Sequence, residues 1–404
     1  MASLDRFSTD KFRPEIALFC LDTDFFPEQP PLPDQSAKFG LGIQTSGTPY
    51  FLTPAACRHT GTALFIAGQT RFLRNCMRCT HNNNSSDSPL IRRGTGMAAR
   101  AEKRWTNRRI DIGWEAVMGA QSKILSVGNY KVYTETYWKS SDAKTILLVN
   151  GALSTTGSFG QTVKYLQPHY NLVLFDLPFS GQSRAHNPDE MIVSKEDEVH
   201  ILLQLIDLYQ VNYLLSVSWG GVSALLALAE CPPSVEKAII SSFSPVLNAP
   251  MLDYIDKAQV YLAAREKRKI GSLLNDTVGK HLPRLFKLYN YKHLISLAEH
   301  EYGQIDFHIS QIRKLSASNY VERFSSIDIP VLFINGEKDE YTTVEDARMF
   351  SNYIAKSSFN VVPDTGHFLD LESKAAWHHS QKTALSFLGT EVSQQVWPSI
   401  PAMA

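Results

Sequence analysis

The sequence contains few of the features that mark membrane, secreted or nucleic-acid-binding proteins. Nowhere in its 404 residues do about 18 apolar residues run without interruption, and the N-terminus lacks a basic start followed by an apolar core. Lys and Arg together number 40, as do Asp and Glu, so no excess of positive charge favours nucleic acid or an anionic membrane as a partner. We therefore expect a soluble, cytoplasmic protein with no membrane span and no nucleic-acid partner.

Cysteine is also scarce. Of five cysteines, four precede residue 80, and only Cys231 falls in the regularly patterned part of the chain, so a disulfide framework is not expected there. Cys76 and Cys79 form a Cys-x-x-Cys pair with Cys57 and two histidines nearby. There is no second such pair, and the spacing fits no zinc module closely. We expect no metal site.

Residues 1–118 show little sustained period of 2 or 3.6. They contain a proline-rich stretch, an Asn/Ser tract and an Arg-rich run at 92–109. This composition predicts a poorly ordered extension, whose Arg-rich run is either solvated or binds an acidic partner. Because Met97 and Met118 lie just before the regular part, a further hypothesis is that the preceding residues are an over-extended start or a dispensable leader. Peptides from residues 1–90 in native protein would contradict it.

Residues 119–392 have the alternating pattern of an α/β domain. Two β-rich runs separated by Gly128-Asn129 predict a hairpin, and six short apolar runs resemble strands buried on both faces. The hairpin runs are Lys123–Val127 and Tyr130–Trp138, and the others are Thr145–Val149, Asn171–Phe175, Tyr213–Val217, Lys237–Phe243, Pro330–Ile334 and Phe359–Val362. Helical patterns between them predict a mostly parallel sheet with helices on both faces and the hairpin at an antiparallel edge. Residues 393–404 form a C-terminal tail.

One intervening helix can be predicted in detail. Ser194 and Asp197 make a capping signal at its start. Four apolar residues then recur at helical spacing and predict its buried face: Val199, Leu202, Leu203 and Ile206.

Between Phe243 and Pro330 the alternation stops for more than 80 residues. A loop of that length without structure is improbable in a compact domain. Helical patterns at Met251–Arg265 and His293–His300 instead predict a helical lid, at about residues 246–327, inserted between two strands of the sheet.

Ser218 directly follows the run Tyr213–Val217 and precedes a helical stretch. A serine on such a tight strand-to-helix turn is the nucleophile elbow of the α/β-hydrolase fold, in which small residues two positions before and after let the backbones cross closely. Gly220 fits this pattern, whereas Ser216 stands where glycine is usual but is still small. The alternative interpretation is a serine that caps a buried helix.

An acid and a histidine follow the serine in the order that this fold requires. Asp339 and His367 each come just after a predicted strand. We expect His367 to accept the proton of Ser218, and Asp339 to fix the histidine tautomer and stabilise its charged form. Taken singly, Asp339 could also be a turn residue and His367 a polar group at the start of a helix. Asp364 and Glu340 are the alternative acids.

The reaction of such a serine also needs an oxyanion hole. One donor should be the backbone N–H of Trp219, and the other that of Ala152, in the loop that follows Val149. The loop Asp176–Ser183 either braces this site or is a plain surface turn.

Five segments together resemble the bacterial 3-hydroxyacyl-ACP acyltransferases, a family of the α/β-hydrolase fold. The resemblance spans residues 121–390, including the lid, and its elbow has the form Ser-x-Ser-Trp-Gly-Gly seen here. The segments are Asn150–Thr156, Phe175–Ser183, Ser216–Gly221, Asn335–Thr343 and Gly366–Asp370. A His-x4-Asp motif described in the family is incomplete, since His293 is followed five residues later by Ala298.

The resemblance implies transfer of a 3-hydroxyacyl group from acyl carrier protein (ACP) through an acyl-enzyme at Ser218. One family member is a 3-hydroxyacyl-ACP:CoA transacylase or thioesterase of polyhydroxyalkanoate synthesis; a relative makes the ester lipid of rhamnolipids. Residues 241–246 and 275–283 are more similar to the former, and loop 177–183 to the latter. The first is therefore favoured, with CoA or water as acceptor and no cofactor. A general carboxylesterase and a non-catalytic binding module are the competing interpretations.

The predicted lid is rich in cations that are interpreted either as a solvated helical face or as a contact for the acidic carrier protein. They are Arg265, Lys267, Arg268, Lys269, Lys280, Arg284 and Lys287.

Overall fold

The computed structural model describes residues 120–390, and all structural statements refer to this part of the chain. The predictions made for residues 1–118, including the Cys76-x-x-Cys79 pair and the Arg-rich run, and for the tail at 393–404 lie outside the described residues.

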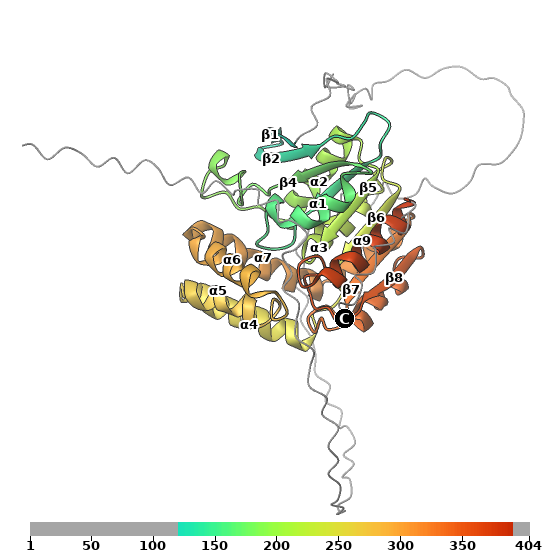
Figure 1. Cartoon of the computed structure of the whole chain (residues 1–404). Coiled ribbons are helices and arrows are strands. Elements are labelled where there is room, and N and C mark those ends of the chain that lie inside the picture. Colours follow the sequence, from blue (N-terminus) through green and yellow to red (C-terminus); the bar gives the residue numbers. More distant parts are fainter. Residues whose placement is uncertain (1–119, 391–404) are drawn as a thin grey trace, which may run out of the picture. The chain divides into compact units, whose positions relative to one another are not determined.

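The described chain forms one eight-stranded sheet in the order β1-β2-β4-β3-β5-β6-β7-β8 (Figure 1). The strands are β1 (Ala120–Val127), β2 (Tyr130–Tyr137), β3 (Thr145–Val149), β4 (Asn171–Phe175), β5 (Tyr213–Val217), β6 (Lys237–Ser241), β7 (Val331–Gly336) and β8 (Ser357–Val362). β1 and β2 pair with each other, and β2 with β4, in antiparallel register, and the remaining pairs are parallel. The predicted mostly parallel sheet with a hairpin at its edge is therefore confirmed.

Helices cover both faces of the sheet because alternate residues of each strand point to opposite sides. On one face Leu147, Leu214 and Phe333 pack against α2 (Lys195–Tyr209), α3 (Gly220–Leu228) and the region of α8 (Val344–Arg348). On the other, Leu148, Leu215 and Leu332 pack against α1 (Gly160–Leu166) and α9 (Lys374–Leu388). Short 3₁₀ turns complete the fold: η1 (Thr156–Phe159), η2 (Arg184–His186), η3 (Tyr320–Ser326) and η4 (Met349–Asn352).

One strand and one helix face differ from the prediction, and a third difference, in the lid, follows below. The run Phe359–Val362 was expected to be buried on both faces, but β8 is the last strand of the sheet and is only partly buried. The capping box of α2 is present, with Ser194 and Asp197 bonding to each other's backbone N–H groups. Its fully buried face, however, is centred on Ile201 and Leu205, whereas Val199 and Leu203 lie at the margin.

A helical lid is inserted between β6 and β7. It comprises α4 (Ala249–Ala263), α5 (Lys267–Asp276), α6 (Arg284–Ser296) and α7 (Glu299–Ala317), which lie together on one side of the sheet region (Figure 1). The expected single helix at His293–His300 is wrong, because the backbone leaves the helical conformation at Leu297 and Ala298. Ile255, Leu294 and Ile309 join the core on the α3 side of the sheet, so the lid packs on that side.

None of the helices between residues 120 and 390 combines the length and the apolar composition that crossing a bilayer requires.

Candidate active site

Ser218 lies between β5 and α3 in a conformation that few residues adopt. Its φ is 54°, in the left-handed region, as expected for a strained nucleophile elbow. Gly220 makes this turn feasible, because a Cβ atom at that position would lie 2.3 Å from the carbonyl oxygen of Asn150. Ser216 is fully buried, and its Oγ has no hydrogen-bond partner in the described chain. The turn therefore has room for the serine side chain that replaces the usual glycine, but its hydroxyl makes no hydrogen bond among the described residues.

The structure brings the three predicted side chains into one hydrogen-bonded row. Ser218 Oγ lies 2.9 Å from His367 Nε2, and His367 Nδ1 lies 2.8 Å from Asp339 Oδ2. Both His367 and Asp339 are 4% exposed. In this arrangement the imidazole can take the serine proton while its other nitrogen donates to a buried carboxylate, which is the geometry of a nucleophilic triad.

The carboxylate of Asp339 is held in its ionised form. Burial by itself would raise its pKa, but the adjacent His367 and hydrogen bonds to the carboxylate outweigh this effect and hold the pKa below its usual value. Oδ1 accepts the backbone N–H groups of Tyr341 and Thr342, at 2.9 and 3.1 Å. The Thr342 hydroxyl donates to Oδ2 at 2.6 Å. The acid is thus oriented from both sides before any substrate binds.

The two alternative acids have other partners. Asp364 is exposed and pairs with Lys338. Glu340 pairs with Lys280 at 2.7 Å. Asp339 is therefore the acid that meets His367.

The loop after β3 packs against the nucleophile. A Cβ atom at Gly151 would lie 3.0 Å from Ser218 Cβ, and the next residue, Ala152, is exposed. Leu153 then adopts a φ of 64°, which turns the chain sharply. The N–H groups of Ala152 and Trp219 are thus carried by the two backbone segments that flank the serine, as the oxyanion-hole hypothesis requires.

Asp176 ties two loops of the site together. Its buried carboxylate accepts the N–H of Thr156, at 2.7 Å, and that of Gln182, at 2.8 Å. The Ser183 hydroxyl donates to its backbone carbonyl at 2.7 Å. Burial raises the pKa of Asp176 above its usual value. The loop 176–183 therefore braces the segment that follows Ala152 and is not a plain surface turn.

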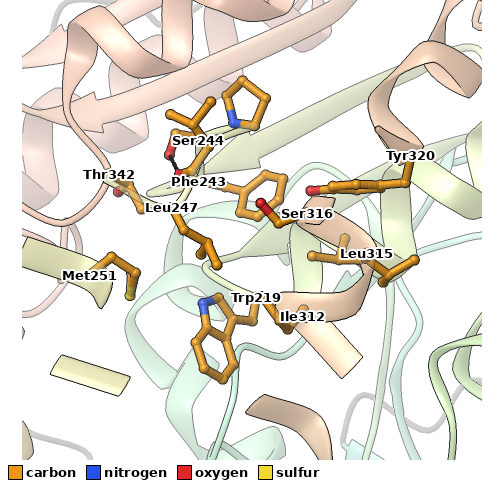
Figure 2. A pocket seen from close by; sticks show the side chains of 13 residues that line it. Trp219, Phe243, Ser244, Leu247, Met251, Ile312, Leu315, Ser316, Tyr320 and Thr342 are labelled. Atoms are coloured by element: carbon orange, nitrogen blue, oxygen red, sulfur yellow. Dashed lines mark hydrogen bonds between the residues drawn. The ribbon is translucent and has the colours of Figure 1, made fainter. Parts of the chain in front are cut away.

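A small apolar pocket is lined by Trp219, the residue that follows the nucleophile in the chain. Figure 2 shows its side chains converging from the elbow, the segment after β6, α4, α7 and η3. Its apolar lining includes Trp219, Phe243, Leu247, Met251, Ile312 and Leu315, and its polar groups belong to Ser244, Ser316, Tyr320 and Thr342. A chain of methylene groups fits such a lining better than a polar ligand does.

Among residues 120–390 no cluster of three or more His, Cys, Asp or Glu is arranged to hold a metal ion.

A model of the α/β-hydrolase fold family matches residues 144–373. The chain belongs to the α/β-hydrolase family. It is 52% identical over 267 residues to the (R)-3-hydroxydecanoyl-ACP:CoA transacylase of Pseudomonas putida. The aligned region covers 66% of this chain and 90% of that relative. The protein of the same name from Pseudomonas aeruginosa is 48% identical over 282 residues, or 70% of this chain and 94% of the relative. These matches confirm the family resemblance indicated by the motifs.

Solved structures agree on the fold. An α/β-hydrolase enzyme from a Medee basin deep-sea metagenome library superposes with a TM-score of 0.55 at 17% sequence identity. The match covers 68% of this chain and 100% of the metagenomic enzyme. At this identity the likeness concerns the fold alone.

The hydrolase also contains site residues that the sequence analysis missed. Thr342 was not singled out, although a hydroxyl residue three positions after the acid is a signal for a side chain that returns to it. His281 of the lid was also missed, and its ring packs closely on Gly366. His293, noted in the sequence for an incomplete motif, lies with Nε2 3.1 Å from the carbonyl oxygen of Leu153. His293 thus contacts the oxyanion loop and has no place in the Ser218–His367–Asp339 row.

Proposed function

We propose that this hydrolase transfers a 3-hydroxyacyl group from ACP to CoA through an acyl-enzyme at Ser218. The observation that carries the proposal is the row Ser218–His367–Asp339 in a chain about half identical to proteins named (R)-3-hydroxydecanoyl-ACP:CoA transacylase. The reaction belongs to the cytoplasm, where ACP and CoA meet. The nucleophile and the base are side chains of the protein, so the proposed chemistry uses no cofactor, and CoA enters as a substrate.

The first half-reaction acylates the serine. Ser218 Oγ attacks the thioester carbonyl carbon while its proton passes to His367 Nε2. The N–H groups of Trp219 and Ala152 would stabilise the negative oxygen that forms. The C–S bond then breaks, and the imidazolium returns its proton to the departing sulfur, which leaves as the thiol of ACP.

The second half-reaction repeats these steps in reverse. The CoA thiol gives its proton to His367, its sulfur attacks the acyl carbon, and the bond to Ser218 Oγ breaks as the serine recovers its proton. Water in place of the thiol would give the free acid, and the hydroxyl of a second 3-hydroxyacyl chain would give an ester dimer.

The apolar pocket supports an acyl substrate. It is lined by Trp219, whose backbone faces the reacting carbonyl in this mechanism, and extends between α4 and α7. An acyl chain that enters beside Trp219 would have its thioester end near Ser218, the preceding residue. The apolar character of this lining favours a substrate with an alkyl tail over one with a polar acyl group.

The experiment is mass spectrometry of the protein incubated with 3-hydroxydecanoyl-ACP, with and without CoA. We expect an acyl adduct on the peptide containing Ser218 and formation of 3-hydroxydecanoyl-CoA when CoA is present. Ser218→Ala should abolish both. Free acid or ester dimer as the main product would keep the acyl-enzyme and change the acceptor. Cleavage of simple esters without conversion of the ACP thioester would overturn the proposal in favour of a general carboxylesterase.

A further inference from the structure

Positive charge is concentrated in one hairpin of the lid, although the whole chain has equal numbers of acidic and basic residues. Residues 265–292 contain eight Lys and Arg but only two acidic residues, Glu266 and Asp276. The eight are Arg265, Lys267, Arg268, Lys269, Lys280, Arg284, Lys287 and Lys292. This segment is formed by α5 and α6, which run side by side in Figure 1.

Helix α6 presents much of the charge that acidic residues do not neutralise, and Arg268 of α5 is likewise exposed without an ion pair among the described residues. Lys267 and Lys280 pair with Glu299 and Glu340. Arg284 and Lys292 are exposed and form no ion pair within the described part of the chain. α6 itself contains no acidic residue. Unpaired cations on a helix without acids create a local positive potential that attracts an acidic surface.

The same face of α6 is also apolar. Leu288 is 47% exposed and Tyr289 is 53% exposed, which makes them two of the most exposed large hydrophobic side chains of the described residues. Leu288 lies four residues from both Arg284 and Lys292, so the three follow one stripe of the helix. Apolar side chains, tyrosine among them, surrounded by cations are typical of a surface that binds another protein.

Both ends of α6 border the nucleophilic site. Just before the helix, the His281 ring packs so closely on Gly366 that a Cβ atom there would lie 2.7 Å from its Cδ2. Near the other end, His293 Nε2 lies 3.1 Å from the carbonyl oxygen of Leu153. Gly366 precedes the histidine of the triad, and Leu153 belongs to the oxyanion loop. The helix therefore spans the site from the histidine side to the oxyanion side.

We propose that the outer face of α6, defined by Arg284, Leu288, Tyr289 and Lys292, is the docking surface for the acidic carrier protein. The carrier would bind there and pass its flexible thioester arm past the rim of the site to Ser218. CoA has the same arm, but it presents phosphates and no large apolar surface, so the exposed Leu288 and Tyr289 favour a protein as the occupant. This inference rests on the proposed acyl transfer and names the surface that selects its donor.

The test compares two substrates that differ in the carrier alone. In Arg284→Glu/Lys292→Glu, kcat/KM for 3-hydroxydecanoyl-ACP should fall about tenfold or more, chiefly through KM, because charges at the edge of an interface act on association. The N-acetylcysteamine thioester of the same acyl group has no carrier protein, so its kcat/KM should stay within about twofold. A matched control is Lys374→Glu/Lys382→Glu on α9, which makes the same charge change on exposed residues of the opposite face of the sheet.

Each result separates docking from catalysis. Selective loss with ACP in the α6 variant, but not in the α9 variant, supports the proposal. Equal loss with both thioesters shows that the cations act on the site itself and overturns it, as does an unchanged kcat/KM for ACP. Equal loss in the α6 and α9 variants means that net charge, not this surface, attracts the carrier. Failure of the unmodified protein to convert any ACP thioester refutes the proposed function instead.

Discussion

Strand β3 and lid helix α6 differ in how they are held. All five residues of β3 are buried, and they pack on helices to both sides. In α6 the buried set is a single residue, Leu294, and its outer face is cationic and apolar. The strands therefore owe their position to apolar packing, whereas the lid has to be fixed by fewer and more specific contacts.

Polar groups supply much of that fixation. Helix α7 carries His308, whose Nε2 lies 2.9 Å from Glu198 of α2, and Glu198 also binds Lys195 at 2.8 Å. Gln304 of α7 exchanges two hydrogen bonds with the backbone of Val193, at 3.0 and 2.7 Å. All three ionisable side chains are at most 8% exposed. The lid is thus attached to the sheet domain through a buried charged cluster at one side of α7.

This contrast separates two tasks. The carboxyl ends of β5, β7 and β8 place the serine, the acid and the histidine, and rigid packing keeps their spacing constant. The lid supplies the pocket walls and the proposed carrier surface. Changes in the sheet should therefore affect catalysis or the stability of the whole domain, and changes in the lid anchor should act first on the lid.

The largest effect is expected at the acid itself. Asp339→Asn retains the size of the side chain but removes the charge that fixes the His367 tautomer, so kcat should fall by about 10⁴-fold. Steady-state kinetics with the ACP thioester measures this, and circular dichroism checks that the fold is intact. Glu340→Gln, at the neighbouring acid that pairs with Lys280, is the control and should change kcat by less than about threefold. Similar losses in both variants would contradict the assignment of Asp339.

A cavity in the sheet core should destabilise the whole domain. Phe333 of β7 is fully buried, with ring centroids 4.3 Å from Phe350 and 5.4 Å from Phe359. Phe333→Ala should lower the free energy of unfolding by about 3–5 kcal/mol. In urea denaturation, all probes should shift together. A loss confined to the lid would contradict the distinction between the two regions.

Breaking the lid anchor should have a smaller and local effect. Glu198→Gln leaves the Lys195 charge buried without its counter-ion, which costs about 3 kcal/mol. Hydrogen exchange should become faster in α7 before it does so in β3 or β5. Glu299→Gln is the matched control, since Glu299 is exposed and its pairs with Arg265 and Lys267 contribute about 1 kcal/mol or less. Exchange that accelerates equally in α7 and β5 would show that the lid does not open separately.

The same anchor should respond to acid. Burial would raise the pKa of Glu198, but Lys195 and then His308 outweigh it and lower the pKa from 4.5 to about 2. Burial lowers the pKa of His308 below 6.5. A carboxylate whose pKa is lower in the folded than in the unfolded protein stabilises the fold at pH values above its unfolded-state pKa. This contribution is lost as the pH falls through its folded-state pKa. The difference in unfolding free energy between the native protein and Glu198→Gln should therefore shrink between about pH 4.5 and 2. A difference that stays constant to pH 3 would contradict the charged state of Glu198.

The sheet was easier to predict from the sequence than the lid. The predicted bounds of Thr145–Val149, Asn171–Phe175 and Tyr213–Val217 match β3, β4 and β5, because strands covered on both faces need runs that are largely apolar. Helices α5 and α6 were not predicted as separate elements. The apolar pattern of α6 is weak because only Leu294 is buried, whereas α5 buries four of its ten residues and its periodicity was missed.

In the site, the sequence predicted which residues follow the strands, but not the contacts made across the fold. Ser218, Asp339 and His367 were found because the carboxyl ends of neighbouring parallel strands share one edge of the sheet. The bonds from Asp176 to Thr156 and Gln182, and the approach of the lid histidines, depend on loop conformations that no local pattern encodes. The catalytic roles themselves stay predictions that the kinetic experiments test.

The smallest predicted effect concerns the residue that departs from the usual elbow. Ser216 has a buried Oγ without a partner, and an unsatisfied buried hydroxyl costs about 1–3 kcal/mol. Ser216→Ala keeps the Cβ atom and removes the hydroxyl, so the free energy of unfolding should rise by about 1 kcal/mol with little change in kcat. Thermal and urea denaturation measure the gain, with Ser223→Ala as the opposite case, because that buried hydroxyl donates to Glu198 and its loss should destabilise. A Ser216→Ala protein of lower stability would show that the hydroxyl is satisfied, and that this polar side chain in β5 is held by a hydrogen bond and not by packing alone.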